Sequence, residues 1–266
     1  MSLCLIAGTG RLPALIAPHA DHLAALEGVE TQVSVPWRIR LETLGTFLAE
    51  LRAAGVDRVC FAGGITRPSV DPARIDTATM PFVPRIASAL KQGDDAALTV
   101  VLALFEEHGI AAVAAHEILP DLLPGSGPLG TLSPSEADMD DIRRAFDVLR
   151  IAGPADMGQG CVVAGGQVLA VEAYPGTDWM LRALAAARSE GGLAIRTPPG
   201  GVLAKAPKPD QDRRVDLPAI GPDTVTAAAE AGLRGIALAS GGVMVLDAED
   251  VRARAEAAGL WIRIGA

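Results

Sequence analysis

Residues 3–20, LCLIAGTGRLPALIAPHA, predict how the chain begins to fold. An apolar run over residues 3–7 is typical of a buried strand, and Gly8-Thr9-Gly10 ends it. Apolar residues then recur at helical spacing over residues 12–20. A strand, a glycine turn and a helix open nucleotide-type α/β units, in which glycine lets a phosphate approach the backbone. The turn is not a full GxGxxG, so a plain connection from strand to helix stays open as the alternative interpretation.

A second apolar run ends in glycines in the same way. Residues 56–62 predict a strand, and Gly63-Gly64-Ile65-Thr66-Arg67 follows it with a hydroxyl and a guanidinium. Ligands of parallel α/β sheets collect at the carboxyl ends of the strands, so we expect both glycine turns on one edge of a parallel sheet. A strand over residues 29–35 and a helix over residues 41–54 are predicted between the two turns.

The composition changes over residues 120–138, where Pro, Gly, Ser and acidic residues replace the apolar pattern. We predict a domain boundary near 131–138, with an N-terminal Rossmann-like α/β domain over residues 1–132 and a C-terminal α/β domain over residues 138–266. In the second domain, Gly165-Gly166 between apolar runs predicts a β-hairpin. Helical and strand patterns alternate around this hairpin, so we expect a mixed α/β domain.

The composition allows a packed core and excludes several partner classes. Of 266 residues, 50% are apolar, 21% are charged and only 3% are aromatic, so the core is expected to be aliphatic. The net charge of −9 argues against nucleic acid as a partner, because binding its phosphates needs a basic face. A small anionic substrate is still compatible with this charge, since local basic clusters outweigh the net value.

The cysteines and the apolar runs indicate a cytoplasmic protein. Cys4, Cys60 and Cys161 are far apart and form no CxxC pair, which favours buried thiols in a reducing compartment over disulfides. We expect no signal peptide, because no basic segment followed by an apolar one opens the chain. No apolar run approaches the length of a membrane-spanning helix.

Charge and proline are concentrated in residues 203–221, LAKAPKPDQDRRVDLPAIG. Prolines cannot continue a helix, so this stretch is predicted to be an extended loop. Its lysines and arginines suit phosphate oxygens, and its aspartates suit a divalent cation or a water proton. A solvated surface loop is the alternative. Asp94 and Asp95 begin another predicted helix, where capping competes with a metal or sugar-hydroxyl contact.

These motifs resemble those of the UDP-2,3-diacylglucosamine pyrophosphatase family of lipid A biosynthesis, as found in alphaproteobacteria. The resemblance covers nearly the whole chain. It is carried by LIAGTG (5–10), CFAG (60–63), TRP (66–68), GDD (93–95), AHE (115–117), GQG (158–160), EA (172–173), GTD (176–178), KAPKP (205–209) and VDLPAIG (215–221). The last two motifs are the most specific, because their order of prolines, lysines and aspartate rarely arises by chance.

The resemblance implies a two-domain hydrolase with its active site between the domains. It implies Mg²⁺ or another divalent cation, and hydrolysis of the acylated nucleotide-sugar to UMP and 2,3-diacylglucosamine 1-phosphate (lipid X), with water attacking the phosphate nearer the sugar. The essential aspartate of the family corresponds to Asp216, which either binds the metal or orients the attacking water. A substrate held in the inner leaflet implies a cytoplasmic protein that visits the membrane peripherally. A homodimer is the assembly that we expect by default.

The predicted site residues follow from these motifs. Asp216 is the predicted catalytic residue, and Asp216 and Asp178 are the predicted metal ligands. The remaining predicted residues share a substrate-binding role: Gly8, Gly10, Gly63, Thr66, Arg67, Asp94, Asp95, Gln159, Gly160, Gly176, Thr177, Lys205, Lys208 and Gln211.

Two positions depart from the pattern of the family, and two other functions compete with hydrolysis. Thr9 stands where a glycine is usual, and Ala239-Ser240-Gly241 stands where Glu-Ala-Gly is expected. A dinucleotide-dependent oxidoreductase would need the third glycine, which Arg11-Leu12-Pro13 does not supply. A non-catalytic binder or carrier of an acylated sugar phosphate or a nucleotide-sugar remains the alternative function, because it would use the same residues.

Overall fold

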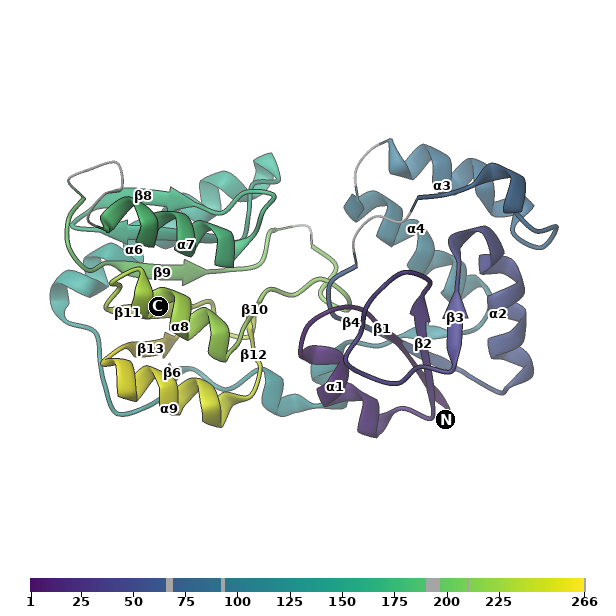
Figure 1. Ribbon diagram of the computed structural model, residues 1–266, viewed down its shortest axis with the longest axis horizontal. Coiled ribbons are helices and arrows are strands. Elements are labelled where there is room, and N and C mark those ends of the chain that lie inside the picture. The colour runs from purple at the N-terminus through teal and green to yellow at the C-terminus, as the bar shows by residue number, and fades with distance from the viewer. Residues whose placement is uncertain (66–68, 92–93, 190–196, 210, 266) are drawn as a thin grey trace. The chain divides into compact units, whose positions relative to one another are not determined.

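The computed structural model spans residues 1–266 and describes all of them except 66–68, 92–93, 190–196, 210 and 266, together with the side chains of 94 and 95. The described chain forms two compact units, which we describe separately (Figure 1). The first consists of Met1–Pro120 and Asp212–Asp216, and the second of Asp121–Gln211 and Leu217–Ala266. The α/β class with two domains, predicted from the sequence, is confirmed.

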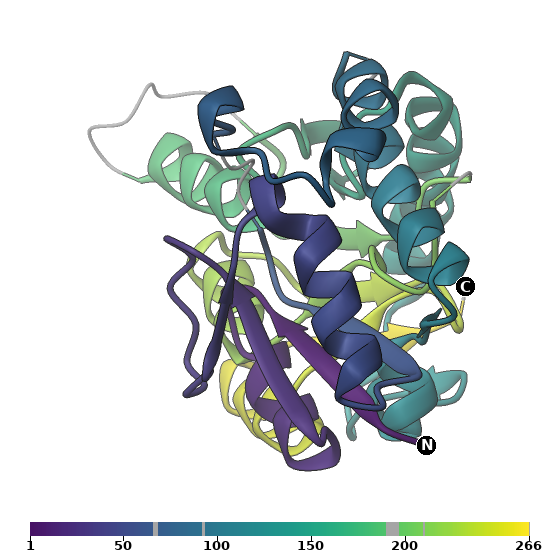
Figure 2. The same cartoon turned by 90° about the vertical axis from the view of Figure 1, so that its right-hand side faces the viewer.

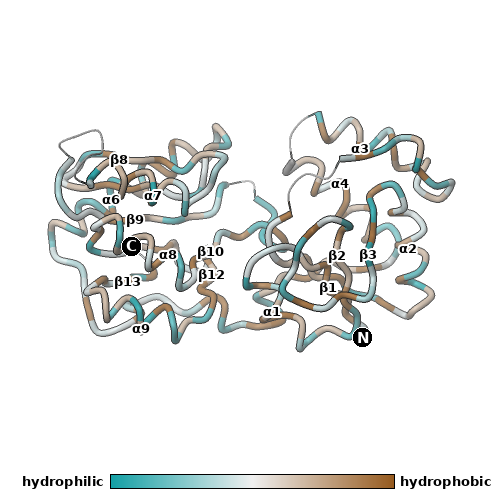
Figure 3. The backbone as a smooth tube through the Cα atoms, viewed as in Figure 1, coloured by the Kyte–Doolittle hydropathy of each residue, from teal (hydrophilic) through white to brown (hydrophobic). Residues whose placement is uncertain are grey.

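The first unit is built on a parallel sheet whose order among the described residues is β3-β2-β1-β4-β5. Its strands are β1 (Leu3–Ala7), β2 (His22–Leu26), β3 (Trp37–Ile39), β4 (Arg58–Ala62) and β5 (Ala111–Ala112). Parallel sheets are covered on both faces, so their central strands are apolar throughout. Accordingly β1 is hydrophobic and buried along its whole length (Figure 3).

Helices cover this sheet and complete its core. They are α1 (Leu12–Ile16), α2 (Leu44–Ala53), α3 (Val83–Leu90), α4 (Asp94–Glu107) and α5 (Ala115–Ile118), with short 3₁₀ turns at Ala17–His19, Leu41–Thr43, Pro72–Arg74 and Met80–Phe82. The helix α2 runs alongside the strands of this unit (Figure 2). Leu48 from α2 and Phe105 from α4 are buried in one hydrophobic cluster with Ile6 of β1. The parallel sheet of the N-terminal domain is confirmed.

One predicted strand of this unit is wrong. Residues 29–35 form no strand, and β2 lies earlier, at His22–Leu26, where it pairs with β1. The helical segment after β1 ends at His19, and β2 begins at His22, so only a short connection separates them. Val29 instead fills the core beside β2 and β3.

The second unit is built on a mixed sheet, whose order among the described residues is β6-β13-β11-β9-β7-β8. Its strands are β6 (Gly127–Pro128), β7 (Gly160–Ala164), β8 (Gln167–Val171), β9 (Val202–Lys205), β11 (Gly235–Leu238) and β13 (Trp261–Ile264). The strands β10 (Ala219–Ile220) and β12 (Met244–Val245) pair separately. The strands β7 and β8 pair as an antiparallel hairpin through Gly165-Gly166, as predicted.

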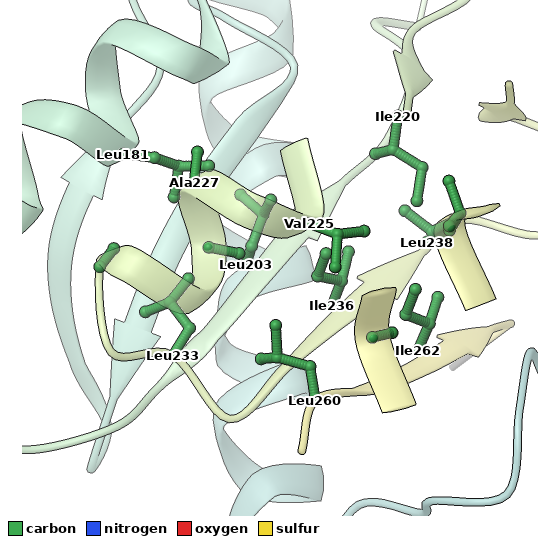
Figure 4. Close-up of a cluster of buried hydrophobic side chains, with 14 of the residues drawn as sticks. Leu181, Leu203, Ile220, Val225, Ala227, Leu233, Ile236, Leu238, Leu260 and Ile262 are labelled. Atoms are coloured by element: carbon green, nitrogen blue, oxygen red, sulfur yellow. The ribbon is translucent and has the colours of Figure 1, made fainter. Parts of the chain in front are cut away.

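The helices of the second unit pack an aliphatic core against this sheet. They are α6 (Glu136–Ala152), α7 (Thr177–Arg188), α8 (Pro222–Glu230) and α9 (Ala248–Ala258), with a 3₁₀ turn at Gly153–Ala155. Leu181, Leu203, Val225 and Ile236 lie in the same buried cluster (Figure 4). This cluster is therefore aliphatic, as the scarcity of aromatic residues predicts, whereas the core of the first unit also buries Phe47 and Phe105.

The two units divide between Pro120 and Asp121, before the predicted boundary at 131–138. The difference has a structural cause, because the polar stretch after Pro120 contains β6. This strand pairs antiparallel with β13, so it belongs to the C-terminal sheet. In addition, Asp212–Asp216 clusters with the first unit although it follows most of the second unit in sequence.

Candidate functional site

The two glycine turns of the first unit meet at the carboxyl edge of its sheet, as the sequence predicted. The backbone N–H of Gly8 donates to Ala62 O (2.7 Å), and Thr9 and Gly64 exchange hydrogen bonds of 2.8 and 3.1 Å. A Cβ atom on Gly8 would lie 2.5 Å from Gly64 O, so only glycine allows this close approach. Two N–H groups of the first turn are thus used within the chain and do not face a ligand.

Gly10 is different from its neighbour Gly8. It has a φ of +87°, and no heavy atom lies within 4 Å of the position that a Cβ would take. The turn therefore leaves open space beside Gly10, where a ligand can approach the backbone.

A buried cation is the centre of the second unit's candidate site. The Nζ of Lys205, at the end of β9, donates to Thr177 Oγ1 (2.6 Å) and to Ala219 O (3.3 Å). Thr177 Oγ1 in turn donates to Glu172 Oε2 (2.9 Å), which lies 3.8 Å from the ammonium. These side chains come from β9, from the first turn of α7 and from the residue after β8, and all are buried.

Burial lowers the pKa of Lys205, and the carboxylates of Glu172 and Asp178 partly offset this effect. An ammonium out of water is stable only when charged or polar groups surround it. The carboxylate of Glu172 therefore helps to keep a positive charge at this position, where an anionic ligand could use it.

Glycines make room for the Glu172 carboxylate. A Cβ on Gly160 would lie 2.6 Å from Glu172 Oε2, and one on Gly158 would lie 2.4 Å from Glu172 O. The Gly158 N–H donates to Glu172 O (3.0 Å), so it is also used within the chain. The GQG motif thus packs against the carboxylate that pairs with Lys205.

The charged loop joins the same group of residues. Gln159 Nε2 donates to Gln211 Oε1 (2.6 Å), which also accepts from the backbone N–H of Lys208 (3.2 Å). The Nζ of Lys208 donates to Asp156 Oδ1 (2.5 Å). The structure therefore brings together residues predicted from three stretches that are distant in sequence: Gln159, Gly160, Thr177, Lys205, Lys208 and Gln211.

The segment that carries Asp216 belongs to the first unit and is fixed by Arg214. The guanidinium donates to Asp212 Oδ1 (3.0 Å) and Oδ2 (2.7 Å), and it also pairs with Glu106 of α4. The backbone N–H of Asp216 donates to Asp212 O (3.1 Å). Asp216 is half-buried, and its backbone lies in a turn that Arg214 holds.

The other predicted residues lie apart from these contacts or outside the described residues. Thr66 and Arg67 lie outside them, and of Asp94 and Asp95 only the backbone is described, at the start of α4. Gly176 is the N-cap residue of α7, with a φ of +85°, and no side chain caps this end of the helix. Thr177 instead uses its hydroxyl in the Lys205 contact.

Metal and thiol chemistry are constrained by the described side chains. No three His, Cys, Asp or Glu residues within the described part of the chain lie close enough together to form a metal cluster. Mg²⁺ needs only one or two carboxylates when phosphate oxygens and water complete its shell, and the exposed Asp178 and half-buried Asp216 suit that role singly. Burial raises the pKa of each cysteine thiol to about 12, which excludes a thiolate nucleophile near neutral pH.

Glu172 is the residue to which sequence analysis assigned no role. A carboxylate that ends an apolar strand and is followed five residues later by a threonine is a weak signal. The role of Glu172 becomes clear from its partner Lys205, which comes from the distant strand β9 and whose ammonium lies 3.8 Å from the carboxylate.

The two units together define a class of protein: an α/β protein with a glycine-lined sheet edge in one unit and a buried lysine among polar side chains in the other. Family models for the LpxI N-terminal domain and the LpxI C-terminal domain match residues 2–122 and 125–263. The chain therefore belongs to the LpxI family. It is 41% identical, over 98% of its length and 96% of the relative, to the UDP-2,3-diacylglucosamine pyrophosphatase LpxI of Caulobacter vibrioides.

Proposed function

We propose that this chain hydrolyses the pyrophosphate bond of UDP-2,3-diacylglucosamine in lipid A biosynthesis. The carrying observation is the full-length similarity to a pyrophosphatase of that specificity. The assembly of Lys205 with five other predicted substrate-binding residues supports it, since a buried cation is suited to a substrate with two phosphate charges. Water attacks the phosphorus nearer the sugar, the bond to the bridging oxygen breaks, and the products are UMP and 2,3-diacylglucosamine 1-phosphate.

The proposed site residues have two roles, which are charge neutralisation and orientation of the attacking water. Lys205 and Lys208 neutralise phosphate oxygens, which is the main requirement in phosphoryl chemistry. The carboxylate of Asp216 either orients the attacking water or serves as a ligand of a divalent cation, a role for which Asp178 is the other candidate. Mg²⁺, when bound, neutralises phosphate oxygens as charge develops.

The decisive experiment is hydrolysis of UDP-2,3-diacylglucosamine by the purified chain with Mg²⁺ and with EDTA. We expect release of UMP and lipid X that EDTA abolishes and that Asp216→Asn reduces by at least about a hundredfold. Asp147→Asn is the matched control, because its carboxylate lies on the exposed side of α6, where it pairs with Arg150 (3.1 Å). Activity of Asp216→Asn near the wild-type value would refute the role of Asp216.

The outcome without turnover separates the two candidate functions. Retention of the intact lipid without hydrolysis would identify a binder or carrier of the acylated nucleotide-sugar. Turnover that persists in EDTA would instead support the hydrolase function but refute the requirement for a divalent cation.

We also propose that the chain acts in the cytoplasm, peripherally on the inner membrane, and as a homodimer. Among the described helices, none is both long and apolar enough to cross a bilayer. The acyl chains of the substrate require contact with the leaflet that holds them, and exposed aromatic side chains favour such interfaces. Tyr174 and Trp179, which are 98% and 53% exposed, flank Thr177 in sequence. Flotation with phospholipid vesicles tests the membrane association, and light scattering on the purified protein tests the homodimer.

A further inference from the structure

A row of side chains crosses the carboxyl edge of the parallel sheet. In the β1–β2 pair Ile6 lies opposite Ala24, so Glu27, the residue after β2, lies at the same carboxyl edge of the sheet as the glycine turn that follows β1. In the β2–β3 pair Leu26 lies opposite Ile39, which places Glu27 level with Arg40. The backbone N–H of Glu27 donates to Ile39 O (2.7 Å), so the position just past β2 is well defined. Glu27 therefore lies one strand away from the glycine turn at residues 8–10.

The carboxylate of Glu27 is both oriented and accessible. Its Oε2 accepts from Arg40 Nη1 (2.6 Å), and Arg40 Nη2 donates to Glu42 Oε1 (3.4 Å). Glu42 is buried and accepts the backbone N–H of Asp71 (2.8 Å), which fixes it in the fold. The side chain of Glu27 is nevertheless 57% exposed. A guanidinium thus holds the carboxylate in place while leaving it open to a ligand.

This arrangement has a defined chemical use. In doubly wound parallel sheets, the glycine turn after the first strand admits phosphate, and a carboxylate after the second strand accepts a hydrogen bond from a ribose hydroxyl. Open space beside Gly10 and the position of Glu27 directly after β2 reproduce both elements within one unit. The missing third glycine excludes the full dinucleotide motif but not a single nucleotide.

We propose that Glu27 accepts a hydrogen bond from the ribose 2′-hydroxyl of the uridine nucleotide, with the nucleotide phosphate beside Gly10. This inference rests on the proposed function for the identity of the base. It assigns the nucleoside part of the substrate to the first unit and makes Glu27 a determinant of specificity for ribose over deoxyribose.

The test is calorimetric binding of UMP and of 2′-deoxy-UMP to the full chain and to Glu27→Ala. Wild-type protein should bind UMP about tenfold more tightly than 2′-deoxy-UMP, because a charge-assisted hydrogen bond is lost with the hydroxyl. Glu27→Ala should lose this preference while its affinity for 2′-deoxy-UMP stays the same. Glu27→Gln, which keeps the size of the side chain but removes the charge, should give an intermediate preference.

Glu30→Ala is the matched control, since Glu30 is also exposed but lies three residues further along the chain than Glu27. It should keep the full preference for UMP. A preference that persists in Glu27→Ala, equal affinities in the wild type, or no binding of UMP would each overturn the inference. Turnover of UDP-2,3-diacylglucosamine by the same preparation separates these failures from a failure of the proposed function, which would show as no hydrolysis by the wild type.

Discussion

Lys205 is the residue whose environment has the clearest chemical consequence. Its ammonium is buried against Thr177 and Glu172, and burial lowers its pKa. The unfolded chain therefore binds more protons than the folded chain between the lowered pKa and the ordinary one. It follows that the free energy of unfolding rises with pH across that window. The positive charge of Lys205, which an anionic ligand could use, is lost in the same window.

We expect kcat/KM to decrease at alkaline pH, and this alkaline limb should lie at a lower pH than the one at which an ordinary lysine titrates. Lys205→Arg should remove this limb, because a guanidinium stays charged. Lys205→Met should lower kcat/KM about a hundredfold at the pH values at which Lys205 is protonated, and the difference from the wild type should shrink above the lowered pKa. The measurement is kcat/KM over a pH series, and an unchanged alkaline limb in Lys205→Arg would contradict the assignment.

Glu172 raises the pKa of Lys205 against the effect of burial, so Glu172→Gln should move the same limb to lower pH. Asp141 is a suitable control within the same unit. It is also buried, but it accepts the backbone N–H groups of Gly165 and Gly166 at the hairpin turn (3.0 and 2.7 Å). Asp141→Asn should lower stability and leave the pH profile unchanged.

At the scale of elements, the connection between β1 and β4 depends on glycine. The strands pair in parallel from Leu3 to Ala7, and the turns after them are in backbone contact. A side chain at residue 8 would have to push Gly63 and Gly64 away. The shape of this sheet edge is therefore a property of both turns together.

Gly8→Ala is expected to reduce the free energy of unfolding by about 1–3 kcal/mol, as overpacking does elsewhere. Urea denaturation measures the change. Gly125→Ala is the control, because no heavy atom lies within 4 Å of its Cβ position, and its effect should stay within about 0.5 kcal/mol. Equal losses of unfolding free energy in Gly8→Ala and Gly125→Ala would show that the close backbone contact at Gly8 does not determine stability.

At the scale of the whole molecule, each unit has its own hydrophobic core. Leu48 is fully buried in the first unit and Leu203 in the second, and their clusters share no residue. Proteins with separate cores often unfold in more than one step. The stability of one unit should therefore respond to a core substitution independently of the other.

We expect calorimetry to show two transitions, of which Leu48→Ala shifts one and Leu203→Ala the other. Each substitution should cost about 2–5 kcal/mol in its own unit, because it removes buried methyl groups and leaves a cavity. A single transition that both variants lower equally would show that the units unfold as one.

Local patterns account for the part of the fold that could be predicted. The β1 strand, the Gly165-Gly166 hairpin and the helices over α6 and α9 follow from periodicity and turn residues within short windows. The strand β2 was missed because His22–Leu26 continues the apolar spacing of the helix before it. The boundary between the units was placed too late because β6 is only Gly127–Pro128, too short to show periodicity.

The sequence by itself determined the α/β class, the aliphatic core, the family and the residues of the charged loop, because these depend on composition, periodicity and motif order. Only the tertiary structure decided that Lys205 lies against Thr177, 28 residues earlier, and that Glu27 lies at the same sheet edge as the glycine turn after β1. Such contacts join segments that no local pattern links. They form because packing each core lowers the free energy of the whole unit, and strand register then fixes which polar side chains meet.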